Sequence, residues 1–282
     1  MKFKVFTTLC ALLFVVFSFR NPVNELKPAR ILHQMYDSIK NVKTLRIRVS
    51  ALERIDRKFF SANSEIKLQT HPRKVYFINR ARKLEVLYDS EHLSDKALVK
   101  PHVFPYMPIY LDPGGNMMRR NQHYTIHELG FEFIGKSIAL TINKDKEGLG
   151  NFVYHGKSFK NGYSCLMLEY ENKSYGYTEY MVKEKETASL IALRLCVNDY
   201  LLRYTNDLLN DFGYLKKGTI LKVPTLYCKK AVVYISEKLM LPVSISLYDD
   251  KGLFESYDFS GLEINRPFAR NEFDRDYPGY GF

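Results

Sequence analysis

The chain has 282 residues, and its 42 Lys and Arg side chains outnumber its 31 Asp and Glu side chains, for a formal net charge of +11. Only one long apolar run is present, at the N-terminus, which excludes a membrane protein with several helical spans. The length is sufficient to bury a core without disulfides. A basic surface favours anionic partners, but no nucleic-acid-binding motif accompanies the charge, and we expect no nucleic-acid partner.

The first twenty residues form a targeting segment. Lys2 and Lys4 precede an apolar run from Val5 to Phe19, which is too short to span a bilayer comfortably. Because residues 16–20 contain no A-x-A cleavage site, a cleaved signal peptide and an uncleaved membrane anchor are both open. Either one predicts export, to the periplasm or cell envelope of a Gram-negative-type bacterium, and the anchor would add membrane association through residues 1–20.

A helix is predicted from Pro28, because Ile31, Leu32, Met35, Tyr36 and Ile39 recur at helical spacing. The period then changes to two, which is typical of half-buried antiparallel strands. Alternating or β-branched runs predict these strands at residues 45–49, 66–68, 75–78 and 84–88.

The segment 96–113 contains four prolines and is predicted to be irregular. Thr125 and Glu128 then have the spacing of a capping box, and the apolar stripe that follows predicts one helix through Ile138. Strands resume at residues 152–154, 163–170, 231–235, 243–247, 254–259 and 262–264. One helix, several strands, a second helix and more strands predict an α+β fold.

Residues 180–224 have a separate pattern of strand, helix, helix and strand. Thr187 is positioned to cap the first helix, and Asn198 with Asp199 to cap the second. A turn at residues 216–219 leads to a strand that Pro224 ends. Cys196 lies beside the apolar face of the first helix and is expected to be a buried thiol.

This pattern resembles a LysM module, a family that binds glycans containing N-acetylglucosamine in a groove between two loops. The resemblance implies that the groove would be formed by Glu186, Thr187 and Ala188 on one side and by Tyr214, Leu215 and Lys216 on the other. The sequence departs from the family at Lys185-Glu186, where Gly-Asp is usual, and in a longer loop at residues 208–214. A folded insert without a ligand is the alternative.

Three further segments resemble an envelope protein family of unknown function that is assigned to the LolA-like fold of lipoprotein carriers. They are residues 111–115 (LDPGG), 122–131 (QHYTIHELGF) and 277–282 (YPGYGF). The resemblance implies a curved antiparallel half-barrel covered by helices, formed by residues 21–179 and 225–282, with residues 180–224 inserted between strands. It implies no established activity.

The strongest candidate for a chemical site is His123 with His127 and Glu128. Two histidines four residues apart on one helix could share a metal, but the predicted cap at Thr125 places His123 before the helix. We therefore expect no metal, no cofactor and no catalytic residue, with His123 and His127 as weak metal candidates. No nucleophile elbow or paired carboxylates support catalysis.

These features predict a non-enzymatic envelope binding protein. A sheet lined with Tyr and Phe could hold the acyl chain of a lipid or lipoprotein, and the insert could contact peptidoglycan. The first alternative is a wall-associated scaffold with a filled core that binds glycan or protein only through the insert. The lesser alternative is a metal-dependent hydrolase.

Overall fold

The computed structural model describes residues 27–104, 106–120 and 122–282. The predicted targeting segment, residues 1–20, lies outside the described residues and stays a prediction. Among the helices that the structure describes, none has the length and hydrophobicity needed to cross a membrane.

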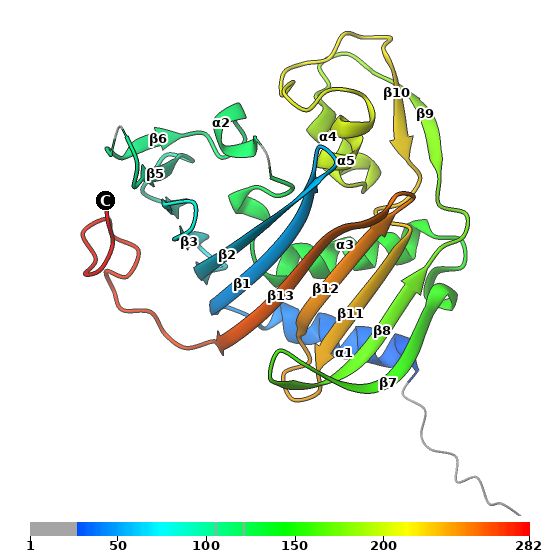
Figure 1. The fold of residues 1–282 in the computed structure, drawn as a ribbon, viewed down its shortest axis with the longest axis horizontal. Helices are drawn as coiled ribbons and strands as arrows, with labels where there is room; N and C mark the ends of the chain where they lie inside the picture. The colour runs from blue at the N-terminus through cyan, green and yellow to red at the C-terminus, as the bar shows by residue number, and fades with distance from the viewer. Residues whose placement is uncertain (1–26, 105, 121) are drawn as a thin grey trace, which may run out of the picture.

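An open antiparallel sheet of eleven strands organises the molecule (Figure 1). Its strand order is β6-β5-β4-β3-β2-β1-β13-β12-β11-β8-β7, and every neighbouring pair is antiparallel. The strands are β1 (Thr44–Ile55), β2 (Lys58–Gln69), β3 (Lys74–Asn79), β4 (Leu84–Asp89), β5 (Ala97–Pro101), β6 (Ile109–Leu111), β7 (Phe152–Lys160), β8 (Tyr163–Glu171), β11 (Lys230–Ser236), β12 (Pro242–Asp249) and β13 (Gly252–Ile264). The predicted α+β class and curved antiparallel sheet are confirmed.

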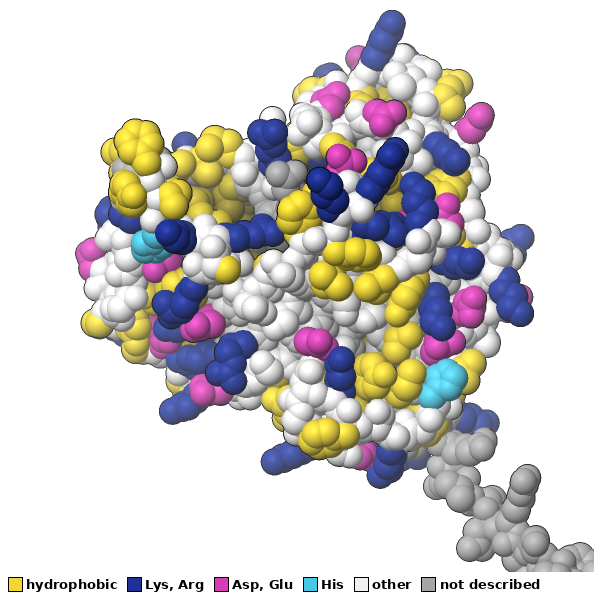
Figure 2. All heavy atoms as spheres, in the orientation of Figure 1, with side chains coloured by type: hydrophobic (Ala, Val, Ile, Leu, Met, Phe, Trp, Pro, Cys, Tyr) yellow, Lys and Arg dark blue, Asp and Glu magenta, His cyan; other side chains and the backbone are white. Residues whose placement is uncertain are grey.

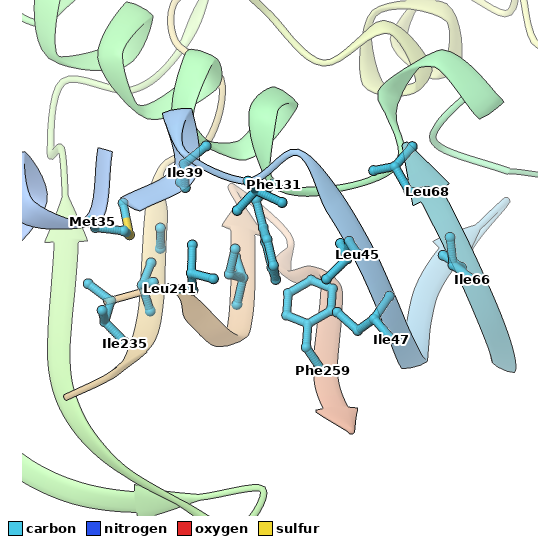
Figure 3. Close-up of a cluster of buried hydrophobic side chains, with 14 of the residues drawn as sticks. Met35, Ile39, Leu45, Ile47, Ile66, Leu68, Phe131, Ile235, Leu241 and Phe259 are labelled. Atoms are coloured by element: carbon cyan, nitrogen blue, oxygen red, sulfur yellow. The ribbon is translucent and has the colours of Figure 1, made fainter. Parts of the chain in front are cut away.

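Two helices, α1 (Pro28–Lys40) and α3 (Phe131–Lys144), cover one face of the sheet (Figure 1). Four of the five side chains predicted on the apolar face of α1 are buried, namely Ile31, Leu32, Met35 and Ile39, whereas Tyr36 is exposed. Figure 3 shows side chains of α1 and α3 lying over side chains of β1, β2, β11 and β13. The alternating strand residues thus form one continuous core under the helices.

The segment between β8 and β11 forms a small unit of its own. Its elements are β9 (Tyr177–Met181), α4 (Ala188–Leu195), α5 (Asp199–Thr205) and β10 (Ile220–Pro224). β9 pairs with β10 in a separate two-stranded sheet, and buried side chains from all four elements or their connections pack together. The two predicted caps are confirmed, because Thr187 accepts a hydrogen bond from Leu190 N and Asn198 accepts one from Leu201 N. Since β8 and β11 are neighbours in the large sheet, this β-α-α-β segment is an insertion between adjacent strands.

Three local predictions were wrong. The capping box of Thr125 and Glu128 forms, but it begins only a short 3-10 helix, η1 (Ile126–Glu128), and α3 is separate. Gly130 divides them with φ of 95°, and a Cβ there would lie 2.5 Å from the side chain of Leu68. The proline-containing segment 96–113 contributes β5 and β6, because Pro101 lies only at the last position of β5 and β6 lies between Pro108 and Pro113. Cys196 is half-exposed and not buried, at the C-terminal end of α4, where its backbone is left-handed.

The C-terminal segment packs against the outer part of the sheet, near β3 to β5. The ring of Tyr280 stacks on that of Tyr76 with centroids 3.7 Å apart. The backbone N of Gly281 donates to the Glu85 carboxylate at 2.8 Å. The C-terminal motif identified in the sequence therefore has a structural role, covering a second cluster of buried side chains.

The remaining short helices are α2 (Asn116–Arg119) and the 3-10 helix η2 (Gly148–Asn151).

Candidate binding cavity

A cavity of about 150 Å³ lies between α3 and the sheet face that it covers. Its lining residues are Val49, Ile66, Tyr124, Glu128, Leu129, Gly130, Phe133, Ile134, Ser137, Ile138, Thr141, Phe152, Tyr170, Tyr227, Cys228, Ala231, Val233, Ile245, Leu247, Glu255, Tyr257 and Phe259. Most of these side chains are apolar or aromatic, so the cavity suits an apolar ligand.

The spacing of side chains along the strands and along α3 explains which residues line the cavity. Ala231 and Val233 are two residues apart on β11, and Ile245 and Leu247 are two apart on β12, so each pair points to the same face. On α3, residues 133, 134, 137, 138 and 141 recur at helical spacing and face the sheet. The polar Thr141 donates its hydroxyl proton to Ser137 O at 2.8 Å, which satisfies it within the helix.

One end of the cavity contains a buried polar cluster around Glu255, whose exposed fraction is 0%. His123 Nδ1 donates to Glu255 Oε2 at 2.5 Å, and His123 Nε2 donates to the Arg54 carbonyl oxygen at 3.2 Å. Burial lowers the pKa of His123, but the hydrogen bond and charge of Glu255 outweigh burial and raise this pKa above its ordinary value. The pair is therefore a buried salt bridge of imidazolium and carboxylate.

Tyrosine hydroxyls complete this cluster. Tyr124 donates to Glu255 and lies 3.0 Å from the hydroxyl of Tyr227, to which Asn198 of the insert donates at 3.3 Å. Tyr257 donates to Glu53 at 2.6 Å. Burial and the charge of Glu255 raise the pKa of Tyr124 and Tyr227 well above their ordinary values, so both hydroxyls keep their protons.

A groove of about 430 Å³ lies between α3 and the insert. Its lining residues are Arg119, His123, Tyr124, Thr125, His127, Glu128, Glu132, Phe133, Lys136, Ser137, Leu140, Ser189, Ala192, Leu193, Cys196, Val197, Asn198, Asp199 and Tyr227. Five residues line both spaces: Tyr124, Glu128, Phe133, Ser137 and Tyr227. The groove and the cavity are therefore adjacent, and these side chains form the wall between them.

Charged side chains at the groove connect the insert to the rest of the chain. Arg119 donates to Asp199 and to Ser189, and Arg203 lies 3.0 Å from the same Asp199 oxygen. Among the residues that the structure describes, none donates a hydrogen bond to the other carboxylate oxygen of Asp199, which is buried. Burial and the charge of Arg203 lower the pKa of Arg119 to about 10, which leaves Arg119 charged at neutral pH. The groove thus offers polar groups where the cavity offers apolar ones.

The two sets of residues predicted for glycan binding lie side by side, because Leu215 N donates to Glu186 O at 2.8 Å. Within this pair of loops, Tyr214 is largely exposed and Lys216 is exposed. The other predicted side chains have structural contacts. Glu186 accepts hydrogen bonds from Tyr180 and Lys183 N and pairs with Arg194, while Thr187 caps α4 and Ala188 is buried. Glycan binding by this loop pair stays a prediction.

The structure does not bring His123 and His127 together as ligands. Both ring nitrogens of His123 have protein partners, whereas His127 is exposed with its ring edge-on to Tyr88 at 5.0 Å. Among the described residues, the one group of His, Cys, Asp and Glu side chains close enough to hold a metal is Asp89, Glu91 and His92. There the ammonium of Lys74 lies 2.9 Å from Asp89 and already supplies a positive charge.

Glu255 and the tyrosine cluster were not predicted from the sequence. The available signal was the acidic residue itself, which shares one strand face with Tyr257 and Phe259 at a spacing of two. A charge at an inward strand position requires a partner. The partner, His123, is 132 residues away in the sequence and lies in a loop, so no local pattern connects the two.

A family model described as "Protein of unknown function (DUF1571)" matches residues 42–186, just over half of the chain. The chain belongs to this family. The DUF1571 match extends from β1 into the insert and includes two of the three segments on which the resemblance was based, residues 111–115 and 122–131. No curated protein sequence matches the chain.

Solved structures with a similar arrangement are distant from this DUF1571 protein. A chain of the Pseudomonas aeruginosa MucA/MucB complex is 9% identical with a TM-score of 0.41, and the alignment covers 87% of this chain but only 60% of that one. Lipoprotein LppX of Mycobacterium tuberculosis is 13% identical with a TM-score of 0.41, over 87% of this chain and 98% of LppX. A LolA superfamily protein of Nitrosomonas europaea is 10% identical with a TM-score of 0.32, over 89% and 99% of the two chains. Similarity at this level identifies no ligand.

Proposed function

We propose that this protein is a non-enzymatic binding protein of the cell envelope that holds the acyl chain of a lipid or lipoprotein between the sheet and α3. The observation that supports this most is the apolar cavity itself, because protein cores are close-packed and leave few voids larger than a water molecule. Removing an acyl chain from water stabilises the complex by about 0.8 kcal/mol per buried methylene group. Such binding needs shape and apolar surface and no reactive group.

The size of the cavity indicates how a chain would lie. An apolar space of about 150 Å³ holds roughly six carbons, since a cavity of that volume in another protein accepts benzene. A longer chain would continue past the wall of Tyr124, Phe133 and Tyr227 into the groove, whose volume of about 430 Å³ is typical of ligand sites. The polar end of the ligand would then face the polar groups of the groove.

Native mass spectrometry of the purified protein tests this proposal. We expect an adduct with the mass of a fatty acid or lipid, or uptake of one equivalent of palmitate after delipidation. Protein that is always empty and takes up no palmitate would contradict acyl-chain binding.

A second candidate function is supported by the adjacent loops of the insert. The hydrogen bond between Leu215 N and Glu186 O leaves Tyr214 and Lys216 exposed at one site, where an aromatic ring can stack on a sugar. If the insert binds peptidoglycan, Tyr214→Ala should abolish retention on insoluble peptidoglycan. The exposed residue Tyr110, changed to Ala, is the control for a lost surface ring. Equal retention of both variants would argue against this role.

A further inference from the structure

Large hydrophobic side chains are concentrated on the surface around β5 and β6. Phe104 is 85% exposed and Met117 is 72% exposed, and four more large side chains in the same stretch are at least two-fifths exposed: Val103, Tyr106, Met107 and Tyr110. Figure 2 shows hydrophobic side chains gathered over this end of the molecule, where Figure 1 places β5, β6 and α2. Soluble proteins rarely leave such a group uncovered, so this patch is an interaction surface.

Basic side chains adjoin this patch. The turn between β3 and β4 contains Arg80, Arg82 and Lys83, all of which are exposed. The turn is held against the patch, because His102 N donates to Lys83 O at 2.7 Å and Leu84 pairs with Pro101 in the sheet. Arg80 has an exposed acidic partner, Glu65, at 3.4 Å.

The combination of exposed aromatic and apolar side chains with neighbouring basic groups matches the surface of an anionic bilayer. Phe, Met and Tyr side chains enter the boundary between head groups and acyl chains, while Arg and Lys side chains pair with anionic head groups. We propose that residues 103–104, 106–110 and 117, together with the basic turn at residues 80–83, dock this protein on an anionic lipid surface. This surface is separate from the cavity, and the proposal does not depend on what the cavity holds.

The chain contains no tryptophan, so a single introduced indole can report on one position. The test uses the full-length chain with Phe104→Trp and vesicles of phosphatidylglycerol and phosphatidylethanolamine. We expect a blue shift of the emission and quenching by brominated lipid, because the indole enters the bilayer. Vesicles of pure phosphatidylcholine should produce neither effect.

The matched control is Phe159→Trp, since Phe159 is 73% exposed on β7, at the opposite edge of the sheet. Because both variants share the same N-terminal segment, anchoring through residues 1–20 cannot produce a difference between them. Adding Arg82→Gln and Lys83→Gln to Phe104→Trp should weaken the vesicle titration by roughly tenfold or more. The absence of a shift at position 104, or an equal shift at positions 104 and 159, would overturn the proposal.

Discussion

His123→Ala is expected to lower the free energy of unfolding by about 3–5 kcal/mol, because it leaves the carboxylate of Glu255 buried without its charged partner. The change also removes a ring that stacks between Tyr200 and Phe254, with centroids 4.4 Å from each. Urea unfolding followed by circular dichroism measures the effect. A loss of this size is a large part of the stability of a typical domain, about 5–15 kcal/mol.

Two controls separate the buried pair from general damage. His33→Ala removes an imidazole from an exposed pair with Asp37 on α1 and should change stability too little to resolve. The double variant His123→Ala with Glu255→Ala should cost less than His123→Ala alone, because no unpaired charge remains. Tyr124 and Tyr257 would keep partners in Tyr227 and Glu53. A double variant as unstable as the sum of the single changes would contradict this explanation.

The same pair sets the direction of a pH dependence. Since Glu255 raises the pKa of His123 in the folded state, the folded protein holds a proton that the unfolded chain releases above about pH 6.5. The contribution of the pair is therefore complete below that pH and is lost as pH rises through the folded-state pKa. Between pH 6 and 9 the free energy of unfolding should fall less in Glu255→Gln than in the unmodified protein.

Ala231→Leu is expected to weaken palmitate binding roughly fiftyfold. Ala231 is buried on β11 and lines the cavity, so the three added carbons would occupy space that about three methylene groups of the ligand need. At about 0.8 kcal/mol per methylene, the loss is about 2.4 kcal/mol. Titration with a fluorescent fatty acid, followed by competition with palmitate, measures the change.

Val232→Leu is the matched control for the cavity variant. Val232 is the next residue on β11, so its side chain points to the other face of the sheet and does not line the cavity. This variant should bind palmitate as the unmodified protein does, and thermal melting should show that both variants fold. Unchanged affinity in Ala231→Leu would mean that the ligand lies elsewhere.

Local patterns in the sequence were sufficient to predict most of the elements. The apolar spacing in residues 31–39 predicted α1, and the side chains of Thr187 and Asn198 predicted where α4 and α5 begin. These predictions were correct because spacing and capping act over a few residues. The prediction of one helix from residue 125 was wrong because the break at Gly130 depends on Leu68, which lies on another element.

The site was predicted less completely than the fold, for the same reason. Alternating Tyr and Phe residues indicated which sheet face is apolar, but the volume left between that face and α3 depends on how the elements pack. The pairing of His123 with Glu255 joins a loop to β13, and the groove joins α3 to the insert. Contacts between distant parts of the chain leave no periodic signal, so the sequence identified His123 only as a weak metal candidate.

The location of a bound acyl chain is the most direct test of the account. A fatty acid with a photoreactive diazirine near its methyl end can be bound to the full-length protein, cross-linked by light and mapped by peptide mass spectrometry. We expect the label on cavity residues of α3, β11 and β12, such as Ile138, Val233 and Ile245. Labelling confined to the exposed side chains at residues 103–117 would show that the chain binds outside the cavity and would contradict the proposed function.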